Sequence, residues 1–272
     1  MMSGISKVFI DSRFRTADSK SPTDFKFELT ESIDLPDNCY AYIDDVIIPY
    51  TWYSIEPYNS VLYVQENNNG IIGNRILTLT TQNNTGVTLA SDLQTQFNNA
   101  YGVNYYNVSF NTNRGTISIV SNNVNRVFKI FTYNELQTYP PNSNWNLPYN
   151  PNNLSLANDT FRLSTPMNMT TSYESGFVDL LNDCSLYLRS PNLSNFTYLG
   201  SRGECDIMKT IPVSASYGYM IIDTINTLGI NGINISRLTL KTLEFKLTNS
   251  YSRVIDLHGS NISFSIAFVT KY

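Results

Sequence analysis

The sequence predicts an all-β protein built as an antiparallel two-sheet sandwich, with the jelly roll as the leading candidate topology. Two observations predict this fold. Roughly ten short segments alternate apolar with polar or small residues at a period of two, which is the pattern of strands with one buried face. Long connections rich in Asn, Pro and Gly separate them, and a single passage shows helical periodicity. This arrangement favours an antiparallel fold of two packed sheets.

The last of these segments is the clearest strand. Ile262, Phe264, Ile266 and Phe268 alternate with small residues without a break. Burying one such side chain contributes about 1.5–3 kcal/mol, so we expect this segment to dock into a sheet. The other expected strands are Asp24–Leu29, Cys39–Tyr50, Val61–Gln65, Ile76–Thr80, Tyr105–Asn111, Gly115–Val120, Val127–Phe131, Phe177–Leu188, Cys205–Val213, Gly218–Asp223, Leu238–Leu247 and Arg253–Leu257.

The strand Cys39–Tyr50 contains a change of phase. Its apolar positions are Ala41 and Ile43 in the first half and Val46 and Ile48 in the second. A shift of one residue within a strand is what a β-bulge produces, and we predict a bulge here.

The one helical passage follows the strand Ile76–Thr80. Leu89, Leu93, Phe97 and Ala100 fall on a stripe with a 3.6-residue period. Ser91 with Gln94 three residues later is expected to form a capping box, and Gly102 to end the helix. We expect about three turns lying across a sheet. Later in the chain, prolines and asparagines crowd residues 138–158, which we predict to be a long surface loop.

Composition excludes several classes of function. Only 15% of the 272 residues are charged and the net charge is −4, whereas a general nucleic-acid binder needs clustered Lys and Arg. We therefore expect no direct nucleic-acid binding. Met1–Ile10 lacks the apolar core of a signal peptide, and no run of about 18 apolar residues occurs. We expect neither secretion nor a membrane span.

No cofactor or metal site is predicted. The three cysteines, Cys39, Cys184 and Cys205, have no C-x-x-C spacing, and His258 is the only histidine that could join them as a zinc ligand. We expect all three to be buried small apolar side chains. Neither G-x-x-x-x-G-K-[ST] nor G-x-G-x-x-G occurs, so no phosphate-binding loop is indicated.

No catalytic residues are predicted either. Asp44 and Asp45 are adjacent in a strand, so their side chains point to opposite faces and share a site only if a bulge intervenes. Asp256 and His258 lie on one face of an expected strand, but no G-x-S-x-G places a nucleophile beside them. The chain is therefore expected not to be an enzyme.

An aromatic cluster is more unusual. Tyr50, Trp52, Tyr53 and Tyr58 fall close together around two prolines. Such side chains can close the end of a sandwich, form a subunit interface or stack on sugars. The sequence leaves these possibilities open.

Several passages occur together in one order along the chain. They are Asp11-Ser12-Arg13-Phe14-Arg15, Ser21-Pro22-Thr23-Asp24-Phe25, Ile48-Pro49-Tyr50, Thr88-Leu89-Ala90-Ser91-Asp92-Leu93, Ile211-Pro212-Val213, Phe245-Lys246-Leu247-Thr248-Asn249 and Ile255-Asp256-Leu257-His258-Gly259. Together they resemble the penton, or minor capsid, proteins of polinton-like viruses, adintoviruses and virophages. The resemblance covers most of the chain.

The resemblance implies a single jelly roll with an inserted elaboration that carries one helix. It implies an extended arm at residues 1–22, a jelly-roll domain at 23–272 and an insertion at about 66–172. The protein would form homopentamers at the fivefold vertices of an icosahedral double-stranded DNA virus capsid, beside a double jelly-roll major capsid protein. It would be made inside the host cell and reside in the virion.

Five residues are the expected contacts in such an assembly. Arg13 and Arg15 are expected to bind a neighbouring subunit or the inner shell, and Tyr50, Trp52 and Tyr53 to contribute to a subunit interface. Two other functions remain as alternatives. A carbohydrate-binding jelly-roll module would use Trp52 or Tyr53, and a hydrolase would have only Asp44, Asp45 and Asp256 as candidates.

Overall fold

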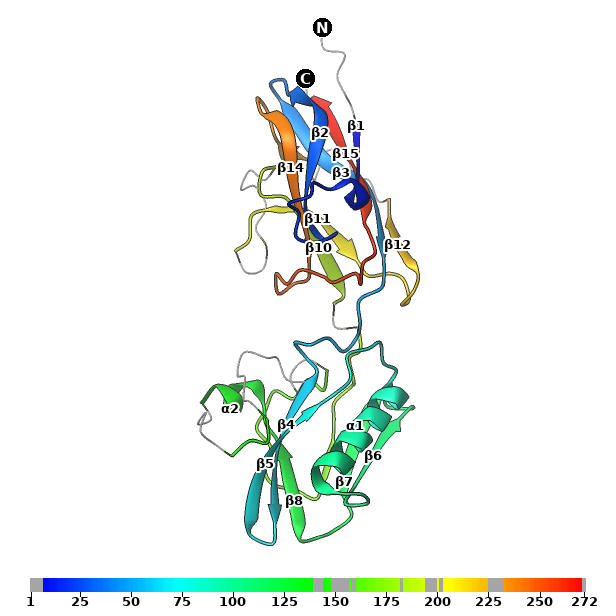
Figure 1. The fold of residues 1–272 in the computed structure, drawn as a ribbon, viewed down its shortest axis with the longest axis vertical. Coiled ribbons are helices and arrows are strands. Elements are labelled where there is room, and N and C mark those ends of the chain that lie inside the picture. The colour runs from blue at the N-terminus through cyan, green and yellow to red at the C-terminus, as the bar shows by residue number, and fades with distance from the viewer. Residues whose placement is uncertain are drawn as a thin grey trace. The chain divides into compact units, whose positions relative to one another are not determined.

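The computed structural model describes residues 7–138, 144–147, 157, 160–181, 183–193, 200, 203–224 and 232–270. The chain divides into two compact units, and each is described here by itself (Figure 1). Unit 1 is Met1–Trp52 with Asp183–Tyr272, and unit 2 is Tyr53–Asn182. All pairings between the described strands are antiparallel, which confirms the predicted fold class.

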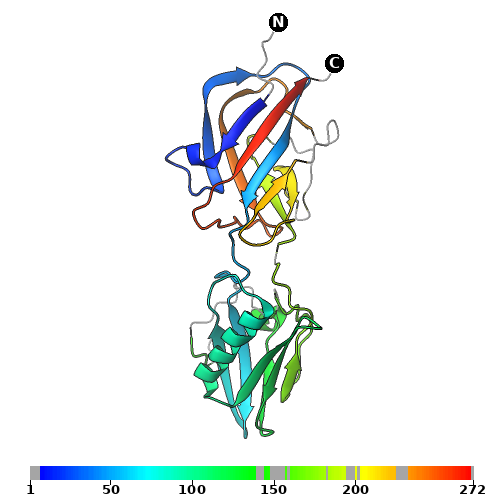
Figure 2. The same ribbon diagram turned by 90° about the vertical axis from the view of Figure 1, so that its right-hand side faces the viewer.

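Unit 1 is a sandwich of two sheets. The first has the order β1 (Lys7–Asp11), β15 (Ser263–Thr270), β3 (Cys39–Pro49) and β12 (Met220–Asp223), and the short β13 (Ile233–Asn234) also pairs with β3. The second has the order β11 (Ile207–Pro212), β10 (Ser185–Arg189), β14 (Thr239–Thr248) and β2 (Asp24–Asp34). Figure 2 shows β1, β15 and β3 side by side. Two antiparallel sheets of this kind form the predicted sandwich of single jelly-roll type.

The core of unit 1 lies between these sheets. Phe264 of β15 meets Phe245 of β14 edge to face, with ring centroids 4.8 Å apart. Ile262, Phe264, Ile266 and Phe268 are all buried, as their alternation predicts. Since the large side chains of β15 all enter the core, its small ones face the other side of the sheet.

The predicted bulge is confirmed in β3. Ile43 lies opposite Ile266 and Val46 opposite Phe264, so three steps along β3 match two along β15. The extra residue restores the burial of Val46 and Ile48 in the same core as Ala41 and Ile43.

Unit 2 consists of two three-stranded sheets and the helix α1 (Gly86–Tyr101). One sheet has the order β5 (Ile71–Thr78), β4 (Val61–Asn68), β8 (Arg126–Ile130), and the other the order β6 (Tyr106–Asn111), β7 (Thr116–Ser121), β9 (Ser172–Glu174). A six-residue helical segment, α2 (Tyr133–Thr138), follows β8. The whole of the predicted insertion, 66–172, falls within this unit.

The helix α1 confirms the predicted apolar stripe but not its cap. Leu89, Leu93 and Phe97 are fully buried against the sheets, and Gly102 ends the helix at φ +97°. The capping box is formed by Thr85 and Thr88, so the helix begins more than a turn before Ser91. The predicted cap at Ser91 is wrong because the Thr85 hydroxyl already accepts the backbone N–H of Thr88.

Two predicted strands differ from the structure. Arg253–Leu257 forms only an isolated bridge between Val254 and Thr248, because the Asn249 side chain accepts the backbone N–H groups of Tyr251 and Arg253 and folds the chain into a turn. The predicted strand Phe177–Leu188 begins only at Ser185, since Val178 and Asp179 donate to loop carbonyls. Of the predicted loop 138–158, residues 139–143, 148–156 and 158 lie outside the described residues, as do residues 1–6 of the predicted arm.

Candidate assembly surface

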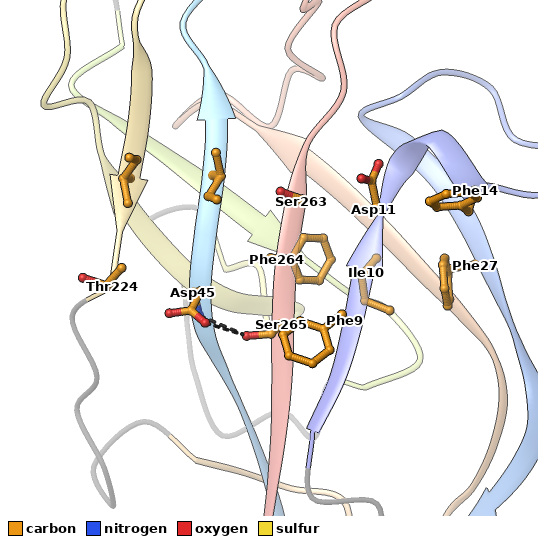
Figure 3. A pocket seen from close by; sticks show the side chains of 12 residues that line it. Phe9, Ile10, Asp11, Phe14, Phe27, Asp45, Thr224, Ser263, Phe264 and Ser265 are labelled. Carbon is orange, nitrogen blue, oxygen red and sulfur yellow. Dashed lines mark hydrogen bonds between the residues drawn. The ribbon is translucent and has the colours of Figure 1, made fainter.

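A groove of about 440 Å³ lies on the outer face of the first sheet of unit 1 (Figure 3). Strands β1, β15, β3 and β12 of that sheet contribute to it, together with Phe27 of β2, and most of the lining is apolar. The lining residues are Phe9, Ile10, Asp11, Phe14, Phe27, Asp45, Ile47, Ile222, Thr224, Ser263, Phe264 and Ser265.

The groove follows from the register of the strands. Small residues of β15 form its floor, where Ser263 lies opposite Ile47 of β3 and Ser265 lies opposite Phe9 of β1. On the far side Ile222 of β12 lies opposite Ile47. The alternation in β15 therefore serves both faces of the sheet, since its large residues fill the core and its small ones leave the hollow.

The walls of the groove are apolar side chains that reach solvent. Phe9, Phe14, Ile47 and Ile222 are between 40% and 73% exposed. Met220, two residues before Ile222 on the same face of β12, is also exposed. Scattered single apolar residues are common on protein surfaces, but a contiguous group on one sheet face marks an interaction surface.

The bulge in β3 brings two carboxylates to one end of this face. Lys7 Nζ lies 2.6 Å from Asp44 Oδ2 and 2.9 Å from Asp45 Oδ2. The hydrogen bond from Lys7 holds the pKa of Asp45 below its ordinary value, and the two carboxylates raise the pKa of Lys7. Ser265 Oγ also donates to Asp45, over 3.2 Å (Figure 3). The paired carboxylates thus tie the edge strand β1 to β3.

Arg13 and Arg15 lie just beyond β1. The Arg13 guanidinium is exposed and donates from Nε and Nη2 to the carboxylate of Asp11, which lines the groove. This pairing lowers the pKa of Asp11. Arg15 is half-buried and donates from Nη1 to the carbonyl of Ser12 over 2.9 Å. Of the two, Arg13 presents more of its side chain at the end of the groove.

The predicted aromatic residues lie elsewhere and do not line the groove. Tyr50 and Trp52 are buried in the core of unit 1, stacked with their centroids 4.1 Å apart, so core packing accounts for both. Tyr53 is half-buried, and its backbone N–H donates to Glu56. A ring that stacks on a sugar must offer an open face, which the buried rings of Tyr50 and Trp52 do not.

The remaining candidates form no catalytic arrangement. The Asp256 carboxylate accepts the backbone N–H of His258, whose ring Nδ1 lies 2.7 Å from the carbonyl of Thr51. Among the described residues no group of three or more His, Cys, Asp or Glu could hold a metal ion. Cys39 is buried as expected, but Cys184 is exposed and Cys205 is half-buried, because both lie on segments just before an edge-forming strand pair, β10 and β11.

Sequence analysis missed the walls of the groove, although a signal for them exists. The strands contain adjacent apolar residues, as in Phe9-Ile10, Ile47-Ile48 and Ile221-Ile222. Since neighbouring strand residues face opposite sides, one member of each pair must point away from the core. Three such pairs on strands of one sheet predict an apolar outer face.

In the part of the chain that the structure describes, no helix is long and apolar enough to cross a bilayer. A scan against models of known protein families finds no match, and neither does a search of curated proteins. The search of solved structures finds similar folds, and one of these matches covers nearly the whole chain.

The fold is similar to that of the mavirus penton protein. The match to the crystal structure of that selenomethionine-labelled protein has a TM-score of 0.55 and covers 97% of this chain and 100% of the other. The two sequences are 11% identical, so the likeness to the mavirus penton protein is one of fold. It extends over residues of both units.

Proposed function

We propose that this protein is a structural capsid protein, a penton subunit that forms homopentamers at the fivefold vertices of an icosahedral double-stranded DNA virus capsid. The observation that supports this most is the likeness of fold to the mavirus penton protein over nearly the whole chain. An insertion or a shared sandwich alone would be weaker support, because many unrelated functions use the jelly roll.

The outer face of the first sheet suits contact with a second copy. In a closed ring each subunit meets its neighbour through two different surfaces, and at least one of them must bury apolar area. The groove offers such area, and its lining acids Asp11 and Asp45 are already paired with Arg13 and Lys7. A neighbouring copy therefore meets little unpaired charge in the groove.

The other partner in this proposal is a double jelly-roll major capsid protein, and the place of the protein is the virion. In this assignment unit 1 is the jelly roll, the arm of residues 1–22 is docked on it through the edge strand β1, and the stretch 66–172 is an elaboration. Arg13 and Arg15 contact a neighbouring subunit or the inner shell. The arm also carries Phe9 and Phe14, so arm and groove form one continuous contact region.

Light scattering on the purified chain tests the assembly. A mass near five times 30.8 kDa supports the proposal. If the chain alone is monomeric, co-expression with the major capsid protein followed by microscopy of the particles tests whether the chain occupies the vertices. Particles whose vertices lack this chain would refute the penton assignment.

Variants test the contact region. Replacing both Arg13 and Arg15 with Ala is expected to lower the pentamer yield or incorporation into capsids, as is Ile222→Asp in the groove wall, because a buried unpaired carboxylate opposes association. Leu238→Asp is the control, since Leu238 is also an exposed apolar residue, at 40% against 61% for Ile222, and lies outside the groove. Unchanged assembly of the Arg13/Arg15 variant would exclude their role.

A further inference from the structure

The first sheet of unit 1 ends in two free edges, those of β1 and β12. Among the described strands, β1 pairs only with β15 and β12 only with β3. In an antiparallel ladder, residues that bond to the partner strand alternate with residues whose N–H and C=O groups point away from it. One hydrogen bond of known position in each ladder therefore assigns the backbone groups that point to the open side.

In β12 these outward groups belong to Met220 and Ile222. The N–H of Tyr50 donates to the carbonyl of Tyr219 over 2.9 Å, so residue 219 bonds to β3. Two residues later Ile221 bonds to β3 as well, and its side chain is buried. Met220 and Ile222 direct their N–H and C=O groups to the open side, and their side chains are 57% and 61% exposed on the outer face.

The edge of β12 lacks the usual protection against pairing. Natural proteins block free edges with charged side chains, proline or bulges. The other three strands at the ends of the two sheets of unit 1 carry such residues: Lys7 and Asp11 in β1, Lys26, Glu28 and Glu31 in β2, and Lys209 and Pro212 in β11. The one charged residue of β12, Asp223, is buried and lies 3.5 Å from Lys209. β12 thus combines outward backbone groups with apolar side chains, which favours an extended strand as its partner.

β1 has the complementary edge. The N–H of Ser12 donates to the carbonyl of Ile262 over 2.9 Å, so Ile10 also bonds to β15, whereas Phe9 directs its N–H and C=O groups outward. The Phe9 side chain is 73% exposed and lies on the outer face beside Ser265 (Figure 3). Each strand of the sheet is antiparallel to the next, so β1 and β12 run in opposite directions. The β1 strand of a second copy therefore fits beside β12 as an antiparallel neighbour, with the two outer faces on one side.

We propose that β12 of one copy pairs with β1 of the next, so that the first sheet continues from subunit to subunit. Phe9 of the second copy then lies opposite Ile222 or Met220 on the outer face, and these apolar side chains pack together. The charges of Lys7 and Asp11 do not oppose the contact, because both are paired within their own subunit. A strand pairs with the outward backbone groups of β12, which neither a lipid tail nor a flat protein surface does.

This pairing rests on the proposed function and names a contact that would close its ring. β1 and β12 are opposite edges of one sheet, so the contact joins two different surfaces of the subunit. Contacts of this head-to-tail kind generate a closed ring when the rotation between successive copies closes.

Disulfide cross-linking of the full-length chain tests the pairing. On oxidation, the double variant Phe9→Cys/Ile222→Cys is expected to form linked oligomers up to the pentamer, because opposite residues of an antiparallel pair lie within reach of a disulfide. Phe9→Cys/Met220→Cys tests the register shifted by two residues. Within one copy two strands separate β1 from β12, roughly 14 Å in all, so a bridge inside the subunit is not possible. Phe9→Cys/Leu238→Cys is the control and should give no linked ladder, since Leu238 is exposed but lies on neither edge.

A second pair of variants tests the backbone groups. Ile222→Pro removes the outward N–H of residue 222 and leaves the bonds to β3 intact, so it is expected to lower the association constant by about tenfold or more. Ile222→Val keeps the N–H and should associate like the native chain. Thermal unfolding of both variants should match that of the native chain. Equal association of the two variants would overturn the pairing.

The outcomes separate this contact from the penton assignment. Pentamers that give no cross-link in either register would overturn the edge pairing and leave the penton assignment intact. Cross-linked chains that never close into pentamers would support the pairing and count against the penton assignment. Protection of the β12 amides from hydrogen exchange only when the major capsid protein is added would assign the edge to that protein and overturn the pairing, as would a chain that neither associates nor cross-links.

Discussion

The Lys7 side chain binds the edge strand β1 to the rest of its sheet. β1 pairs only with β15 among the described strands, and it lies at the edge of its sheet. The ammonium group crosses the outer face of β15 to reach Asp44 and Asp45 on β3. Exposed ion pairs usually contribute little to the free energy of folding. Here, however, one ammonium group neutralises two carboxylates that the bulge in β3 places side by side.

Replacing Lys7 with Met is therefore expected to weaken the docking of β1 in a pH-dependent way. Because the folded-state pKa of Asp45 is lowered, its contribution is present above its unfolded value of about 4 and is lost as the pH falls through the folded value. Because the pKa of Lys7 is raised, its contribution is present below about 10.5 and is lost above its folded value. Amide hydrogen exchange in β1 measures the effect.

The difference between the native chain and Lys7→Met should be constant near neutral pH and shrink in acid. Lys20→Met is the control, since the exposed Lys20 ammonium lies 3.6 Å from a carboxylate of β2, that of Asp24, and not from one of β3. Equal exchange of β1 in both variants at every pH would show that Lys7 does not hold the strand.

At the level of elements, hydrophobic periodicity predicts the strands and helices whose positions depend on burying apolar side chains. It does not predict turns and caps that depend on hydrogen bonds from side chains to the backbone. The bulge in β3 and the stripe of α1 follow from the positions of buried residues alone. The turn after β14 depends on one amide, that of Asn249, and the cap of α1 on the hydroxyls of Thr85 and Thr88, a pair that the S/T-x-x-E/Q pattern does not select. Local side-chain bonds of this kind are not visible in a hydrophobic pattern.

The residues of the candidate surface could be predicted only in part, because a hydrophobic pattern does not show which strands lie side by side. Apolar patterns indicate which residues can be buried. Of the aromatic cluster that stood out in the sequence, Tyr50 and Trp52 are buried in the core, whereas Tyr53 and Tyr58 are half-buried. The groove depends on which strand lies beside which, and this comes from the pairing of β12 with β3 and of β1 with β15. Such long-range neighbours cannot be deduced from one sequence.

Gly86 provides a prediction for the packing of α1 on its sheet. It occupies the first turn of the helix, where Ala would ordinarily stabilise by about 0.5–1 kcal/mol. Here a Cβ at residue 86 would lie 2.2 Å from Phe110 Cζ. Gly86→Ala is therefore expected to destabilise unit 2 by about 1–3 kcal/mol in chemical denaturation.

Phe110→Leu supplies the matching test. The smaller side chain makes room at residue 86, so the double variant should be more stable than the sum of the two single changes implies. Additive losses would mean that the ring of Phe110 moves aside without cost.

Each unit has an apolar core of its own, and unit 2 also has a smaller buried cluster around Tyr63 and Phe131. The core of unit 1 gathers side chains from both of its sheets, and the main core of unit 2 gathers them from its strands and α1. A compact unit with its own core can unfold as a cooperative body. Leu243 and Leu93 are fully buried representatives of the two cores.

Calorimetry is expected to resolve two unfolding transitions in the full-length chain. Leu243→Ala leaves a cavity in the sandwich and should lower the free energy of unfolding of unit 1 by about 2–5 kcal/mol. The midpoint temperature of one transition should then fall by on the order of 10 °C, and that of the other should not change. Leu93→Ala should lower the other transition by a similar amount. A single transition that both variants shift equally would show that the units unfold together. In that case the stability of unit 1 would depend on that of unit 2.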